Sequence, residues 1–76
     1  MKNLNKKLLN FLSKKTKQKI NLTTNLISNQ ILDSMGLIEV VDYIEKDLKL
    51  NCPINKINKI NFNSINLIIK FLKKYN

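Results

Sequence analysis

The stretch ILDSMGLIEVVDYIEKDL, Ile31–Leu48, decides the fold of this chain and contains all five of its acidic residues. Apolar residues recur in it at helical spacing, as a stripe formed by Leu37, Val41, Ile44 and Leu48 and widened by Val40. Asp33 is a natural N-cap, because its carboxylate can accept an unpaired backbone N–H at the start of a helix. The stretch therefore predicts an acidic amphipathic helix from about Ser34 to Lys49, whose stripe other elements must cover.

Helical spacing also marks the two ends of the chain. A first helix is predicted from Asn3 to Lys15, with an apolar face of Leu4, Leu8, Phe11 and Leu12. A last helix is predicted after Asn63 or Ser64, either of which can cap it, with an apolar face of Ile65, Ile68, Ile69 and Leu72. We therefore expect an all-α fold in which three main helices pack into a small bundle.

The connections between these helices differ in length. Thr16–Leu32 is rich in Asn, Ser and Thr and is expected to be a long ordered loop, anchored by Ile20, Leu22, Leu26, Ile27 and Ile31. Pro53 ends the region of the second helix, because its ring cannot continue a helical hydrogen-bond ladder. Isoleucines at every third position, Ile54, Ile57 and Ile60, then predict one short additional helix.

Composition limits what so small a protein can do. Its 76 residues make a single domain, 1–76, with little room for an enclosed active site beside a core. It has no His and one Cys, so no internal disulfide and no Cys/His metal cluster can form, and no catalytic residues stand out. Cys52 is expected to be a small apolar filler. No apolar run is long enough for a membrane span and no secretory signal is evident, so a cytoplasmic location is expected. The three helical stripes, with no cluster of metal ligands, predict a folded monomer.

The charge is divided along the chain. The net charge is +9, all basic residues are Lys, and residues 33–47 alone are acidic, with five acids against Lys46. A basic balance favours nucleic acid or an anionic surface as partner. The abundance of Asn, Lys and Ile, however, is also what A/T-rich codons produce, so the one acidic helix is the more informative feature.

The predicted second helix begins at the triplet Asp33-Ser34-Met35, and Glu39-Val40-Val41 and Ile44-Glu45 follow within it. This pattern resembles the signature of acyl carrier proteins. With Pro53 and the last helix, the resemblance extends over most of the chain. It implies an acyl-carrier-like bundle of three main helices plus one short helix. It also implies that a phosphopantetheinyl transferase attaches 4'-phosphopantetheine, taken from coenzyme A, to Ser34. The arm would then carry an acyl or aminoacyl group as a thioester, as in fatty acid biosynthesis or a specialised pathway.

A carrier is a substrate of other enzymes and not itself an enzyme, so its surface must be recognised by acyl-loading and acyl-processing partners. Charged surfaces speed such encounters and fix their orientation. The expected contact residues are the acids beside Ser34 and two apolar anchors among them: Asp33, Met35, Ile38, Glu39, Asp42 and Glu45.

Two other interpretations fit the basic composition. The chain could be a small Lys-rich helical nucleic-acid-binding protein, because Lys alone can neutralise phosphates. Against this, it has no Arg for bidentate base contacts and few aromatic residues for stacking. Alternatively, its Lys-rich amphipathic first helix could lie on anionic lipid.

Overall fold

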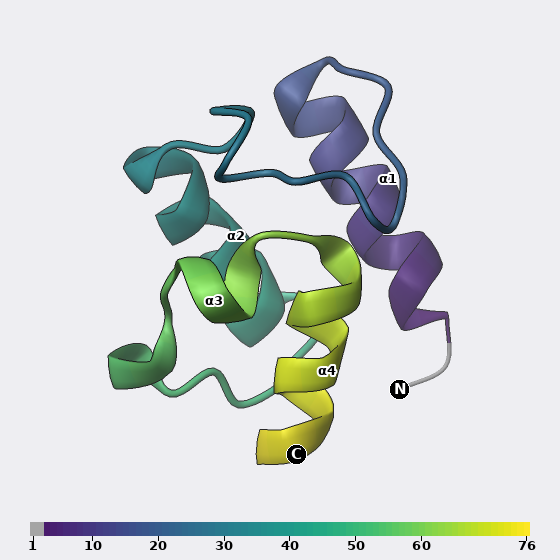
Figure 1. Ribbon diagram of the computed structural model, residues 1–76. Coiled ribbons are helices and arrows are strands. Elements are labelled where there is room, and N and C mark those ends of the chain that lie inside the picture. The colour runs from purple at the N-terminus through teal and green to yellow at the C-terminus, as the bar shows by residue number, and fades with distance from the viewer. Residues whose placement is uncertain (1–2) are drawn as a thin grey trace.

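The chain folds into helices joined by irregular segments, as a computed structural model covering residues 3–76 shows (Figure 1). The elements are α1 (Leu4–Thr16), α2 (Ser34–Lys46), the 3₁₀ turn η1 (Ile54–Lys56), α3 (Lys59–Phe62) and α4 (Ile65–Tyr75). Residues 3–76 contain no β-strand. The predicted all-α bundle of three main helices and one short helix is therefore confirmed, and the stretch marked by Ile54, Ile57 and Ile60 is divided between η1 and α3.

Helix boundaries follow the predicted caps. Asp33 caps α2, and Ser64 caps α4 by accepting the Leu67 N–H at 3.2 Å. The end of α2 differs from prediction, because the helix stops at Lys46 and not at Lys49. Lys49 adopts a left-handed backbone with φ 57°, which turns the chain out of the helix. Apolar spacing could not reveal this turn, because Leu48 still packs against the core from beyond the helix.

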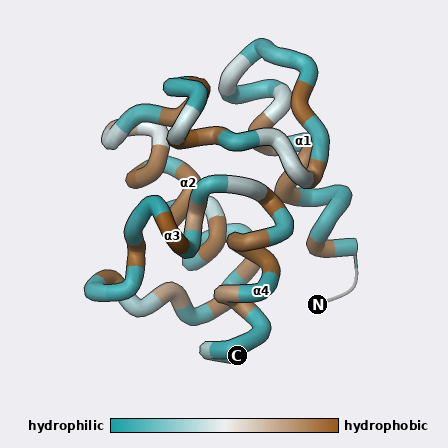
Figure 2. Tube along the Cα trace, viewed as in Figure 1, coloured by the Kyte–Doolittle hydropathy of each residue, from teal (hydrophilic) through white to brown (hydrophobic). Residues whose placement is uncertain are grey.

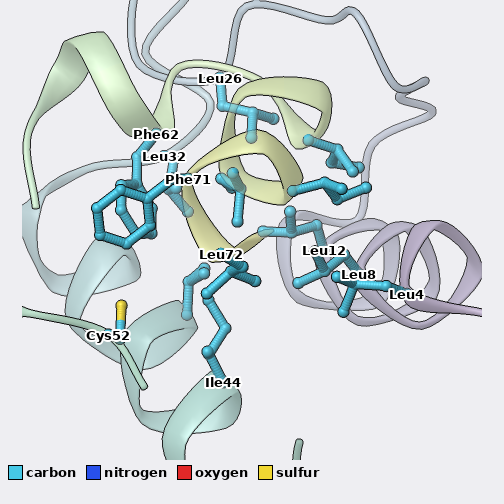
Figure 3. Close-up of a cluster of buried hydrophobic side chains, with 14 of the residues drawn as sticks. Leu4, Leu8, Leu12, Leu26, Leu32, Ile44, Cys52, Phe62, Phe71 and Leu72 are labelled. Carbon is cyan, nitrogen blue, oxygen red and sulfur yellow. The ribbon is translucent and has the colours of Figure 1, made fainter. Parts of the chain in front are cut away.

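The core lies between α1 and α4, with α2 closing one side. The side chains of Leu4, Leu8 and Leu12 lie along the face of α1 that packs on α4 (Figure 3). Phe62 and Phe71 meet edge to face, with ring centroids 5.1 Å apart. Because the apolar stripe of α1 is buried in this core, it is not free in the folded chain to lie on a membrane.

The buried face of α2 is centred one position away from the predicted stripe. Gly36, Val40 and Ile44 are buried, whereas Leu37, Val41 and Leu48 of the predicted stripe are only half-buried. Gly36 explains the difference, because a Cβ there would lie 2.8 Å from Cδ1 of the buried Leu32. The glycine lets α2 approach the preceding loop closely, and its neighbours are left at the edge of the core. Gly36 thus has a packing role.

The long connection between α1 and α2 is ordered, as predicted. In Figure 2 its hydrophobic and hydrophilic positions are interspersed, and its most deeply buried side chain is Leu26. Asn63, at the corner between α3 and α4, holds the connection in place. Its Oδ1 accepts the N–H groups of Ile27 and Ser28 at 2.9 and 3.0 Å, and its carbonyl accepts that of Leu26. This clamp sets the path by which the chain reaches Asp33.

Candidate functional site

Ser34 is the first residue of α2 and is exposed. The preceding Asp33 has an extended backbone, and its Oδ1 accepts the Gly36 N–H at 2.7 Å, so the predicted N-cap is confirmed. The first N–H groups of an α-helix have no acceptor within the helix. Asp33 accepts the N–H of Gly36, the third residue of α2. The N–H groups of Ser34 and Met35 remain available at the positive end of the helix dipole. The Ser34 hydroxyl therefore lies where an attached anion would be stabilised and a second protein could reach it.

A groove runs along the face of α2 that carries Ser34. Positions 34, 38, 41 and 45 are spaced i, i+4, i+7 and i+11 and so share one side of the helix. Leu37, Ile38 and Val41 form one wall of the groove, Ile54 and Ile57 form the other, and its volume is about 350 Å³. Asp42 and Glu45 also line it. Ser34 thus stands on the helix face that borders an apolar groove containing two carboxylates.

The opposite flank of α2 faces the end of α1. Asp33, Met35, Gly36 and Glu39 line a separate hollow of about 340 Å³ together with Lys15. The six predicted contact residues are therefore not one surface. Ile38, Asp42 and Glu45 lie at the groove, whereas Asp33, Met35 and Glu39 lie at this second hollow. Met35 and Ile38 are 66% and 64% exposed, so both are available as apolar anchors and neither belongs to the core.

The three acids within α2, Glu39, Asp42 and Glu45, differ in whether a lysine pairs with them. Glu39 is ion-paired with Lys15, whose side chain is only 19% exposed. Asp42 pairs with Lys46 one turn along the same helix, at 3.1 Å, and both of these side chains are well exposed. Glu45 forms no ion pair with any residue in 3–76. Within residues 3–76, Glu45 is thus the unpaired one of these three acids, and it shares a side of α2 with Ser34.

Sequence reasoning missed Lys15, Ile54 and Ile57 as parts of these sites. The isoleucine spacing drew attention to Ile54 and Ile57 but could not place them opposite α2. Lys15 lies 24 residues from Glu39, and no local pattern connects the two. The pairing of Asp42 with Lys46, by contrast, could have been found from its i, i+4 spacing.

Cys52 is buried, as expected for an apolar filler. Burial, and secondly the charge of Glu45, raise the pKa of its thiol to about 11. Because the thiolate is the nucleophilic form, this thiol is poorly reactive at neutral pH. Residues 3–76 bring no three His, Cys, Asp or Glu side chains together as a metal site. No helix in that range is long and apolar enough to cross a bilayer.

Comparison with known proteins adds no relative: no family model matches the chain, and no curated protein matches it. The likeness to acyl carriers therefore stays a prediction, carried by the residues around Ser34 and by their geometry.

Proposed function

We propose that this chain is an acyl carrier protein whose Ser34 carries a 4'-phosphopantetheine arm. The observation that carries the proposal is the exposed Ser34 at the capped start of α2, on the helix face that borders the apolar groove. A phosphopantetheinyl transferase would supply the catalytic groups. The chain itself contributes an accessible hydroxyl, a favourable electrostatic position and a surface to be recognised.

The attachment step forms a phosphodiester. The Ser34 oxygen bonds to the phosphorus that bears pantetheine in coenzyme A, the bond to adenosine bisphosphate breaks, and the hydroxyl proton is lost to a base of the transferase. The new anion sits at the N-terminus of a 13-residue helix, where a negative charge is stabilised by about 0.3–1 kcal/mol. The thiol at the far end of the arm then takes up an acyl group as a thioester.

The groove offers shelter to an aliphatic acyl group. Its apolar walls are Leu, Ile and Val side chains, and burying apolar surface there contributes about 25 cal/mol per Å². Ile38 and Ile54, at 64% and 84% exposed, would gain most from being covered. An arm attached to Ser34 leaves the helix on this same side.

Partner enzymes would meet Glu45 first among the acids. Its charge is not compensated within residues 3–76, whereas Glu39 is held by the partly buried Lys15. Asp42 is intermediate, because an exposed i, i+4 pair contributes little and can be exchanged for a partner's cation. We therefore place the electrostatic contact of the transferase and the acyl-processing enzymes at Glu45 and Asp42.

The test is incubation of the purified chain with coenzyme A and a broad-specificity phosphopantetheinyl transferase. We expect the intact mass to rise by one arm and a fast-reacting thiol to appear, which Cys52 cannot supply because it is buried. The absence of any mass gain, under conditions that fully modify a known carrier in parallel, would exclude the proposal.

A further inference from the structure

A basic face lies on the part of the molecule built from η1, α3 and α4. It surrounds a hollow of about 470 Å³ whose wall includes Lys56, Lys70 and Lys74 together with the apolar Ile60, Leu67 and Phe71. Residues 48–76 contain six Lys and no acid. None of the residues lining this hollow belongs to α2 or to the long connection, so this face is separate from the surroundings of Ser34.

The lysine charges of the basic face are not compensated. The ion pairs within residues 3–76 are Lys15–Glu39 and Lys46–Asp42, and neither involves this face. Lys74 lies 5.7 Å from the centre of the Tyr75 ring, a contact that leaves its charge in place. The face therefore presents several like charges that a negatively charged partner would neutralise.

Large aliphatic side chains protrude among these lysines. Ile60 is 80% exposed and Leu67 is 37% exposed, and both line the hollow. In Figure 1 η1 lies at the edge of the molecule, beyond α3. Leu67 and Lys70 lie on the outer side of α4, because neither is among the residues that this helix buries in the core. Aliphatic side chains grouped on a surface mark a contact with a protein, a ligand or a membrane.

The residues that line the hollow disfavour nucleic acid as the partner. Asn58 accepts the Asn61 N–H at 3.0 Å, and the Asn61 amide donates to the Lys56 carbonyl at 2.7 Å. The Tyr75 ring packs against Phe71, with centroids 5.0 Å apart, and Phe71 is buried. The hollow contains no Arg for bidentate base contacts, and its Tyr75 ring is already in contact with Phe71 and Lys74.

We infer that the basic face binds the surface of an anionic lipid bilayer. Peripheral membrane binding combines insertion of apolar side chains at the headgroup level with attraction between Lys and anionic lipid. Ile60, which is 80% exposed, suits insertion, and Lys56, Lys70 and Lys74 line the same hollow, where they would meet headgroups. The first helix, which sequence suggested for such a contact, has its apolar stripe in the core. The contact therefore belongs to the other end of the chain.

The test is co-sedimentation of the full chain with vesicles of phosphatidylcholine alone or mixed with phosphatidylglycerol, at low and at physiological salt. We expect binding to the anionic vesicles only, and weaker binding in salt because exposed charges are screened. One Lys near an anionic membrane changes affinity by roughly fivefold. The double variant Lys70→Gln/Lys74→Gln should therefore bind about 25-fold more weakly.

Three further variants separate the contribution of this face from those of overall charge and of the arm. Lys6→Gln/Lys7→Gln removes the same charge from exposed positions of α1 and should weaken binding much less. Ile60→Asn keeps the charge, lies at an exposed position and should still weaken binding several-fold. Ser34→Ala should bind vesicles like the unaltered chain, so the vesicle result does not depend on the carrier proposal.

Three results would overturn the inference. They are no binding to anionic vesicles, an equal loss from the α1 and α4 lysine variants, and no effect of Ile60→Asn. A duplex DNA that binds more tightly than the vesicles and is equally sensitive to Lys70→Gln/Lys74→Gln would also overturn it, in favour of a nucleic-acid surface.

Discussion

Replacing Gly36 with Ala should destabilise the fold, although Ala is the better helix former. In a helix interior Ala is favoured over Gly by about 1 kcal/mol. Here, however, the added Cβ would lie 2.8 Å from Leu32 Cδ1, and Leu32 is only 3% exposed and has little room to move. Overpacking of this kind costs about 1–3 kcal/mol. The same Cβ would lie 3.2 Å from Asp33 Oδ1 and so disturb the cap as well.

The expected balance is a loss of about 1 kcal/mol in the free energy of unfolding, or roughly 4–8 °C in Tm for a domain of this size. Urea and thermal unfolding followed by far-UV circular dichroism measure it. Leu32→Val, which shortens the opposing side chain, provides the matched background, in which Gly36→Ala should cost less or become stabilising. Stabilisation by about 1 kcal/mol in both backgrounds would refute the reasoning, because it would show that no close approach exists at Gly36.

Three further predictions concern charge, the loop clamp and the thiol. Glu45→Gln should lower the transferase's kcat/KM by up to roughly fivefold at low salt. Glu39→Gln should lower it less, because it removes the same charge from an acid already paired with Lys15. Equal losses in the two variants would argue against a contact centred on Glu45. Asn63→Ala should cost about 1–3 kcal/mol by leaving the Ile27 and Ser28 N–H groups unpaired, whereas the exposed Asn66→Ala should stay within about 0.5 kcal/mol in urea unfolding. Because folding raises the thiol pKa of Cys52 from 9.0 to about 11, the thiol contribution to stability should be intact below pH 9 and decline toward pH 11. Alkylation at pH 8 should accordingly be much slower in the folded chain than in urea, and equal rates would contradict the burial of the thiol.

Local patterns predicted the parts of the fold that depend on local physics. Asp33 was identified as a cap from its side chain and position, and the apolar spacing of α1 and α4 marked faces that are indeed buried. The start of α2, which places Ser34, follows from the same local rules. These features need no knowledge of how the helices are arranged.

What sequence could not supply depends on how the elements approach one another. The buried face of α2 is centred on Val40 because Gly36 packs against Leu32, and no periodicity encodes that contact. The pairing of Lys15 with Glu39 requires the end of α1 to lie beside α2. Ile54 forms a wall of the groove because the chain after Pro53 lies opposite α2, which local spacing does not reveal. The sequence therefore places Ser34 at the start of α2, whereas only the packing shows that the acids beside it lie on two different flanks of the helix.

The central claim is that Ser34 carries the arm, and the most direct measurement is the intact mass of serine variants after complete reaction with coenzyme A and the transferase. The chain has four serines, of which Ser28 is the matched control because it is exposed and lies outside the helices. The unaltered chain and Ser28→Ala should each gain the mass of one phosphopantetheine, and Ser34→Ala should gain none while keeping its helical spectrum. A folded Ser34→Ala that still gains the arm would contradict the assignment, and an unaltered chain that gains none would contradict the carrier function itself.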